Sequence, residues 1–230
     1  MKSFIVLSSL FLSQFALAMP QVIPAPVKHL YIPDGFDSND SVEVVITGNF
    51  PNPCLSRNNV QVAIREDLID VKVTALMSYQ KFNCPDMVVP FKEVVSIGNL
   101  QGGQYKVSVN NVLKDTLIVE EASSSAVDEH LYAAIDNVEK MGNGKFLLRG
   151  WRYSNCIESD KIQVLSNHKD TLSVLPIMKQ VSGFCPMKGM PISYELNLDF
   201  SDVKVDEALI HVRTMDGKSF NSIVDLKESR

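Results

Sequence analysis

Four cysteines are the residues of this chain whose type and spacing point most directly to a definite chemistry. Cys54 and Cys84 are about 30 residues apart, and so are Cys156 and Cys185. A structural zinc site usually takes cysteines in close pairs of the C-x2-C kind, and this chain has no such pair. The spacing therefore favours oxidation to two disulfides, although four cysteines alone allow three pairings.

The cysteines belong to an internal repeat that decides among these pairings. Solenoid repeats are typically about 20 to 50 residues long, so a period of about 101 residues indicates two tandem copies of one domain. If each copy folds alone, Cys54 pairs with Cys84 and Cys156 with Cys185. The matching segments are His29-Leu30-Tyr31 with His130-Leu131-Tyr132, Gly48 with Gly150, Val60-Gln61-Val62 with Ile162-Gln163-Val164, and Cys84-Pro85 to Pro90 with Cys185-Pro186 to Pro191.

Within each copy, apolar residues recur at every second position, which is typical of strands in a half-buried antiparallel sheet. Examples are Val42-Val44-Ile46 in the first copy and Tyr194-Leu196-Leu198 in the second. Turn residues separate such runs, so the pattern predicts an all-β fold of two β-sandwiches. Only residues 126–140 have a composition that suits a helix. The match of His130 with His29 argues against a helix there.

Composition along the chain predicts its division into segments. Lys2, an apolar run and Ala16-Leu17-Ala18 have the form of a secretory signal, too short to span a bilayer comfortably. A small, polar stretch near the middle of the chain suits a linker. The predicted segments are a signal peptide at 1–18, an extended leader at 19–27, repeat 1 at 28–120, a linker at 121–127 and repeat 2 at 128–226.

The charge balance bounds the partners. The formal net charge is −5, and neither repeat has the basic cluster that a nucleic acid or an anionic lipid surface requires. We therefore expect no nucleic-acid partner and no stable membrane insertion. A signal peptide and paired cysteines together predict an exported protein, either periplasmic or secreted.

These features resemble the tandem immunoglobulin-like β-sandwich domains of exported bacterial proteins. The resemblance rests on domain size, strand number, one disulfide per copy and the stretch Leu100-x4-Tyr105-x-Val107-x-Val109. Two features depart from the antibody kind. The cysteines of each copy are closer together, and Trp151 has Asn49 at the matching position of the first copy. The resemblance implies the fold but names no activity.

The segments that follow Cys84 and Cys185 are candidates for binding a partner. A disulfide at one end and a proline at the other restrict a loop, and a restricted loop loses less entropy on binding. The alternative is that the prolines simply end a strand while the disulfide staples a small core. The candidate residues are Pro85, Asp86, Met87, Val88, Pro186, Met187, Lys188 and Met190.

No catalytic, cofactor-binding or metal-ligating set can be assembled from the sequence. The chain has no G-x-S-x-G, no H-E-x-x-H and no glycine-rich phosphate loop. Met87, Met187 and Met190 could suit copper(I), but core packing or loop anchoring is the favoured account of these residues. We expect a non-enzymatic binding or structural module with a protein or glycan partner. The alternatives are a protease inhibitor that uses the Cys-Pro loops and a hydrolase with a site between the domains.

Overall fold

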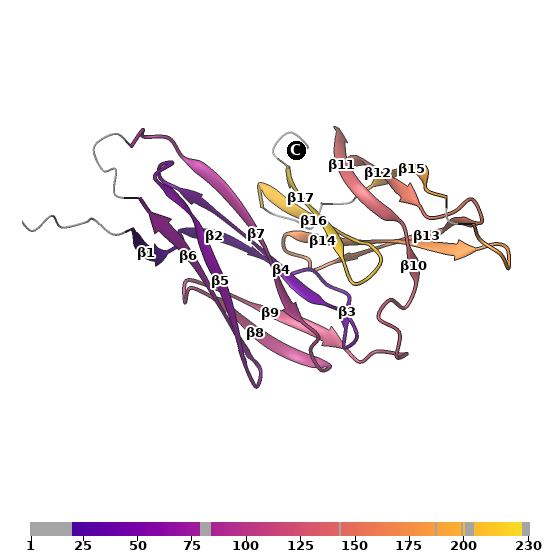
Figure 1. The fold of residues 1–230 in the computed structure, drawn as a ribbon, viewed down its shortest axis with the longest axis horizontal. Helices are drawn as coiled ribbons and strands as arrows, with labels where there is room; N and C mark the ends of the chain where they lie inside the picture. Colours follow the sequence, from indigo (N-terminus) through magenta and orange to yellow (C-terminus); the bar gives the residue numbers. More distant parts are fainter. Residues whose placement is uncertain are drawn as a thin grey trace, which may run out of the picture.

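Repeat 1 folds as a β-sandwich whose two sheets enclose the apolar residues of its alternating strands (Figure 1). The computed structural model describes residues 20–78, 84–142, 144–186, 188–198, 200 and 205–226. One sheet has the order β1-β6-β8-β9-β3, with β5 also paired to β6, and the other has the order β2-β4-β7. The strands are β1 (Gln21–Pro24), β2 (Val27–Tyr31), β3 (Phe36–Asp37), β4 (Val42–Phe50), β5 (Leu55–Arg65), β6 (Leu68–Met77), β7 (Val89–Gly98), β8 (Gly103–Val109) and β9 (Leu113–Glu120).

Repeat 2 has the same two-layer arrangement. One sheet has the order β10-β14-β16-β17, with β13 paired to β14, and the other has the order β11-β12-β15. The described residues contain no helix, so residues 126–140 are not helical, as predicted. The strands are β10 (Leu131–Tyr132), β11 (Ala134–Gly142), β12 (Lys145–Arg152), β13 (Ile157–Ser166), β14 (Thr171–Gln180), β15 (Met190–Asn197), β16 (Glu207–Arg213) and β17 (Ser219–Asp225).

Both disulfides form within a repeat, as predicted. Cys54 is bonded to Cys84 and Cys156 to Cys185, with Cα–Cα distances of 5.9 Å and 5.6 Å. Each bond joins the residue just before β5 or β13 to the connection that leads into the opposite sheet. The structure is therefore all-β, with two tandem immunoglobulin-like sandwiches and one disulfide in each.

One predicted match between the copies is wrong. His29-Leu30-Tyr31 lies in β2, which pairs with β4, whereas Leu131-Tyr132 forms β10, which pairs with β14. The equivalent residues at this point are Ala25 and Ala133. Their amides donate to the carbonyls of Val73 and Pro176, at 2.9 Å and 3.0 Å. The first strands are thus related by 133 − 25 = 108 positions, so the two His-Leu-Tyr triplets lie in different sheets.

The first strand of each repeat changes sheet at this alanine. In repeat 1, β1 pairs with β6 of one sheet and β2 with β4 of the other. Gln21–Pro24, within the predicted leader, is consequently part of the sandwich. The signal-peptide prediction, residues 1–18, lies outside the described residues.

The matching glycines, Gly48 and Gly150, are required where the strand changes sheet. A Cβ at Gly48 would lie 2.3 Å from the carbonyl oxygen of Pro26, and one at Gly150 only 1.9 Å from that of Ala134. Backbone cannot retreat from such contacts as a flexible side chain can. The repeated glycine therefore has a packing reason, and its prediction as an equivalent pair is confirmed.

Replacing Gly150 with alanine should destabilise repeat 2. Forcing a methyl group against the Ala134 carbonyl requires the first strand to move, and overpacking of this kind costs about 1–3 kcal/mol. Chemical denaturation should show a lower free energy of unfolding for Gly150→Ala. Gly189→Ala is the control, because nothing lies within 4 Å of a Cβ there. Equal stability of the two variants would contradict the assigned close approach.

Candidate functional site

The two Cys-Pro connections are exposed at their disulfide-anchored ends. Pro85, Asp86, Met87 and Val88 are all exposed, with Met87 57% and Val88 62% accessible. The turn in this segment is held by a hydrogen bond from the Met87 amide to the Pro85 carbonyl, 3.0 Å. The first candidate loop therefore presents apolar side chains to solvent from a backbone fixed at one end.

The second connection has the same character but different residues. Pro186 and Lys188 are exposed, Met190 begins β15 half-buried, and Met187 lies outside the described residues. The Ser154 hydroxyl donates to the Pro186 carbonyl at 2.7 Å, and the Lys188 amide donates to the Tyr153 carbonyl at 2.9 Å. Its most exposed apolar side chain is Phe184, 83% accessible, which the sequence pattern did not single out.

The structure does not bring these two connections together. The β13–β14 hairpin contacts repeat 1, and β14 then runs away from it for ten residues, about 30 Å. Figure 1 shows the start of β7 at one end of the molecule and the end of β14 at the other. The two connections are separate surfaces rather than one.

Repeat 2 packs against the outer face of the β2-β4-β7 sheet. The contact has an apolar centre in which Tyr31 and Val45 of repeat 1 meet Leu209 and Ile223 of repeat 2. The first three of these residues are fully buried. Figure 1 shows β16 and β17 lying between the two sandwiches. The sheet of repeat 1 is therefore covered on both faces.

Beside this apolar centre lies a buried ion pair. Arg213 of β16 bonds Asp40 of repeat 1, and both side chains are only 9% exposed. The same guanidinium donates to the Gly35 carbonyl at 2.6 Å and lies 5.1 Å from the centre of the Phe36 ring. The charge of Arg213 is thus matched almost entirely by groups of repeat 1.

His211 is a polar side chain buried deep in the interface, only 1% exposed. The side-chain nitrogen of Asn221 donates to Glu43 at 2.7 Å, so its oxygen is the atom left to accept from His211 Nδ1, 2.9 Å away. This assigns the proton to Nδ1 and leaves the buried Nε2 as an unpartnered acceptor. Burial lowers the pKa of His211, although Glu43 opposes this effect, so the ring is neutral near pH 7.

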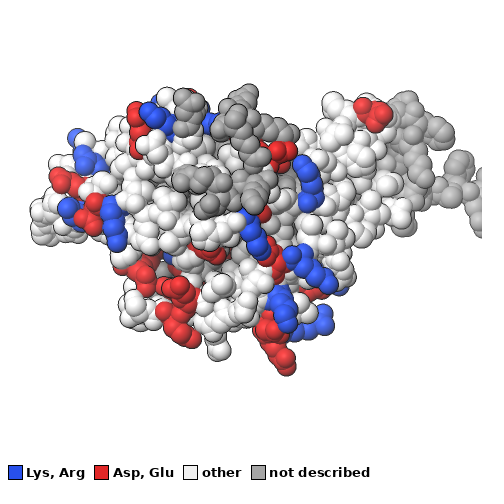
Figure 2. All heavy atoms as spheres, turned by 180° about the vertical axis from the view of Figure 1, so that it is seen from behind, with Lys and Arg blue, Asp and Glu red and all other residues white. Residues whose placement is uncertain are grey.

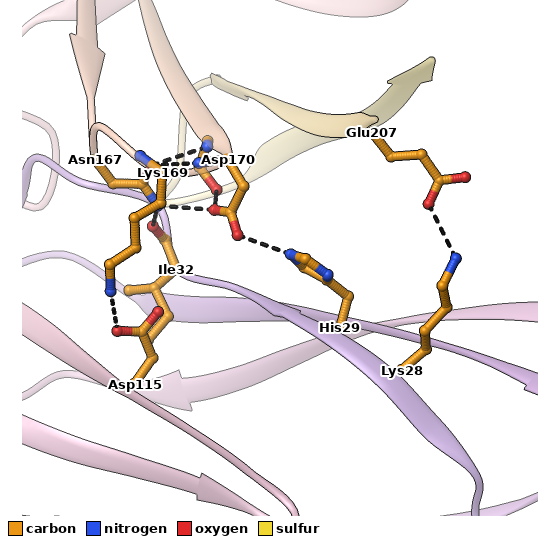
Figure 3. A network of polar contacts seen from close by, with 9 residues as sticks. Lys28, His29, Ile32, Asp115, Asn167, Lys169, Asp170 and Glu207 are labelled. Carbon is orange, nitrogen blue, oxygen red and sulfur yellow. Dashed lines mark hydrogen bonds and ion pairs between the residues drawn. The ribbon is translucent and has the colours of Figure 1, made fainter. Parts of the chain in front are cut away.

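A second set of polar contacts, shown in Figure 3, joins the β13–β14 hairpin to repeat 1. His29 Nε2 lies 2.8 Å from the Asp170 carboxylate, and the Asn167 amide donates to the Ile32 carbonyl at 3.1 Å. Burial raises the pKa of Asp170, but hydrogen bonds from His29, Asn167 and Thr171 outweigh it and hold the pKa below its ordinary value. At the margins, Lys169 pairs with Asp115 and Lys28 with Glu207.

The interface has little room for a substrate beside its buried histidine. The hollow lined by Asp40, Glu43, His211 and Arg213 has a volume of about 10 Å³, about enough for one water molecule. The polar groups there bond one another. The polar side chains in this region therefore hold the two domains together.

Among the described residues, the structure offers no support for the metal-binding hypotheses. In the described part of the chain, no three His, Cys, Asp or Glu side chains come together as a metal site. Met87 and Met190 belong to different repeats, the first just before β7 and the second at the start of β15. Over the same residues, no helix is long and apolar enough to cross a membrane.

Charge is evenly distributed on the surface that Figure 2 shows. Basic and acidic side chains are interspersed there, and the basic ones form no continuous patch.

The fold and contacts together define a pair of β-sandwiches that are fixed to each other and contain one disulfide each. Residues 44–119, from β4 to β9, match the family model described as the ORF11 beta-sandwich domain. This match covers the central part of repeat 1, and the chain is similar to that family there. Neither the curated proteins nor the solved structures gave a match.

Breaking the buried ion pair should weaken the domain contact strongly. Arg213→Met leaves the Asp40 carboxylate buried without its cation, a change that typically costs about 3–5 kcal/mol. The control is Lys28→Met in the exposed pair with Glu207, for which we expect less than about 1 kcal/mol. Urea denaturation would compare the two, and equal effects would argue against the assigned burial.

The burial of His211 predicts an acid-sensitive domain contact. Its pKa is lower in the folded chain than the unfolded value of about 6.5, so the unfolded chain binds the proton first. Stability should therefore be full above about pH 6.5 and fall as the pH drops below it. Glu43, Asp40 and Arg213 face the ring, and the first two partly offset the loss.

Denaturation at about pH 7.5 and about pH 5.5 would measure this dependence. A His211→Gln variant should lose stability by less than the unmodified chain over that interval. His130→Gln is the matched control, because His130 is exposed. An unchanged dependence in His211→Gln would assign the acid sensitivity to other groups.

Proposed function

We propose that the chain is an exported, non-enzymatic binding module that engages a protein partner through its Cys-Pro connections. The observation that carries this proposal is that each disulfide anchors a connection whose apolar side chains are exposed. Met87, Val88 and Phe184 are more than half accessible in a fold that buries most of its large apolar residues. Exposed apolar groups on a restrained backbone bind with little loss of entropy.

Export is the second part of this proposal. Disulfides persist in oxidising compartments, and both cysteine pairs are joined. The form of residues 1–18 supports a secretory signal. The compartment is therefore periplasmic or extracellular, in a bacterial envelope or its surroundings.

The domain contact gives the module its geometry. The buried Arg213–Asp40 pair and the apolar centre around Tyr31 fix one sandwich against the other. The two connections are then held at a set distance on opposite ends of a rigid body. A partner with two binding points, or two partners bound at once, would be kept at that spacing.

Loop replacement tests this proposal. The chain and two variants, one with residues 86–88 and one with residues 182–184 replaced by Gly and Ser, would serve as baits in envelope and secreted extracts. The captured partner should then be purified and its Kd measured by interferometry. We expect at least one replacement to weaken binding about tenfold or more. Val112→Ser, at an exposed valine far from both connections, is the control.

Two other outcomes would change the assignment. A partner retained by both variants would move binding to another surface. Stoichiometric slowing of a secreted protease, lost on replacement of residues 86–88, would identify the narrower function of a protease inhibitor.

A further inference from the structure

A shallow hollow lies on the outer face of the β11-β12-β15 sheet and is lined in part by Pro191, the proline at which the second Cys-Pro connection ends. Its volume is about 450 Å³, and Trp151, the single tryptophan of the chain, forms part of its wall. The indole is 49% exposed, and its Nε1–H donates to the Asp136 carboxylate at 3.0 Å. This hydrogen bond fixes the orientation of the ring while leaving much of its surface in solvent.

The backbone forms this hollow by the same construction in both repeats. A bulge puts an extra residue into the strand after the sheet change, Asp136 in β11 and Lys28 in β2. The buried glycines Gly48 and Gly150 also correspond, as do Pro90 near the start of β7 and Pro191 near the start of β15. In repeat 1 the corresponding hollow, about 420 Å³, includes Glu207 and Ile223 of repeat 2 in its lining. There, Glu207 pairs with Lys28 at 3.6 Å.

The two hollows differ in what they can bind. Trp151 stands where repeat 1 has Asn49, Arg149 where it has Thr47, and Ser193 where it has Lys92. Around the hollow, the interface residue Tyr31 is replaced by Glu139. In repeat 1, Tyr31 helps to hold the second sandwich in place. Repeat 2 has no apolar side chain at the equivalent position. It retains the hollow and lines it with one aromatic ring among polar groups.

A second copy of this chain is a poor occupant. If its repeat 1 docked as repeat 2 does, Lys106 would take the place of Leu209 and Lys114 that of Asn221. In the existing contact, Asn221 donates a hydrogen bond to Glu43. Lys145 stands at the position of Glu43 in repeat 2, so Lys114 would approach Lys145 instead. Like charges would replace a hydrogen bond, so the face is not suited to head-to-tail assembly.

We propose that the hollow around Trp151 binds a pyranose ring of a glycan. A pyranose has an apolar C–H face bounded by hydroxyl groups. Its C–H face would stack on the exposed indole, as apolar groups pack on aromatic rings. The Asp136 carboxylate, the Arg149 guanidinium and the Ser193 hydroxyl line the same hollow and match the hydroxyl rim. Arg149 is held by Glu139 at 3.2 Å, so its position is also set in advance.

Of the described residues that line this hollow, only Pro191 belongs to a Cys-Pro connection, so changes at Trp151 and changes at residues 86–88 or 182–184 test the two proposals separately. Tryptophan emission of the full chain comes from Trp151 alone, which makes it a direct reporter. The probes are defined oligosaccharides of neutral hexoses, N-acetylhexosamines and uronic acids. We expect at least one of them to change the emission saturably with a Kd below about 1 mM.

Calorimetry of variants then assigns the site. Trp151→Ala should weaken binding about tenfold or more, Trp151→Phe less, and Asp136→Ala should weaken it too. Phe184→Ala, at an even more exposed aromatic residue in a Cys-Pro connection, should leave the Kd unchanged. Thermal unfolding checks that the Trp151 variants remain folded, as expected for a side chain that is half exposed.

Three outcomes would overturn the proposal. One is the absence of saturable binding to any oligosaccharide of the panel. Another is binding that Trp151→Ala leaves unchanged. The third is capture of a protein partner that depends on Trp151 while no oligosaccharide binds, which would make this face a protein interface.

Discussion

The contact between the outer face of β2-β4-β7 and the strands β16 and β17 determines how the rest of the molecule is arranged. Tyr31 and Val45 give this sheet a second apolar face, opposite the core of repeat 1, and an apolar face of this kind must be covered. Repeat 2 covers it and in doing so buries Arg213 and His211. Burying a charge is costly unless it is paired, so Arg213 requires Asp40, whereas the neutral His211 is bonded by Asn221, which donates in turn to Glu43.

The same contact explains why two copies of one fold have diverged. Repeat 1 uses its β2-β4-β7 face and is no longer free to present it. The equivalent face of repeat 2, the outer face of β11-β12-β15, does not contact the other repeat over the described residues. There, Glu139 and Trp151 stand where Tyr31 and Asn49 stand in repeat 1. The strands on the other side of the contact differ in the opposite sense. Leu209 of β16 is apolar and covered by repeat 1, whereas Lys106 stands at the equivalent position of β8. At the positions of Tyr31 and Leu209, each repeat thus carries an apolar residue only where the other repeat covers it.

Much of the fold could be predicted from the sequence because its evidence is local. Alternation of apolar residues identified strands, and the cysteine spacing within one copy identified the disulfides. The match between the His-Leu-Tyr triplets gave a wrong equivalence between the repeats, because identity over three residues is weaker evidence of equivalent positions than strand pairing in a sheet. It gave the correct absence of a helix in 126–140 for a wrong reason. The correct equivalence of Ala25 and Ala133 depends on hydrogen bonds to strands about 45 residues away.

The site could be predicted less well, because its residues meet only through the docking of two domains. Asp40 and Arg213 are separated by 173 residues, and His29 and Asp170 by 141. No spacing in the sequence joins such pairs. Trp151 was visible as the single tryptophan and as a departure from Asn49, and this difference between two otherwise equivalent positions was the available signal. Its exposure could not be read from the sequence, since a tryptophan in a strand is more often buried.

The linker also takes a different role once its contacts are known. A short Ser/Ala segment in solution would allow the two sandwiches to move and to bind by avidity. In the structure, Asn39 of repeat 1 donates to the carbonyls of Ser124 and Ala126, and the Ala122 amide donates to Ser38. Asp128 accepts from the amides of Asp216 and Gly217. Since the linker is bonded at both ends and the domain contact is buried, the separation of the exposed surfaces is set by packing. Any gain from two simultaneous contacts then depends on whether the ligand matches that distance, rather than on how far a flexible linker can reach.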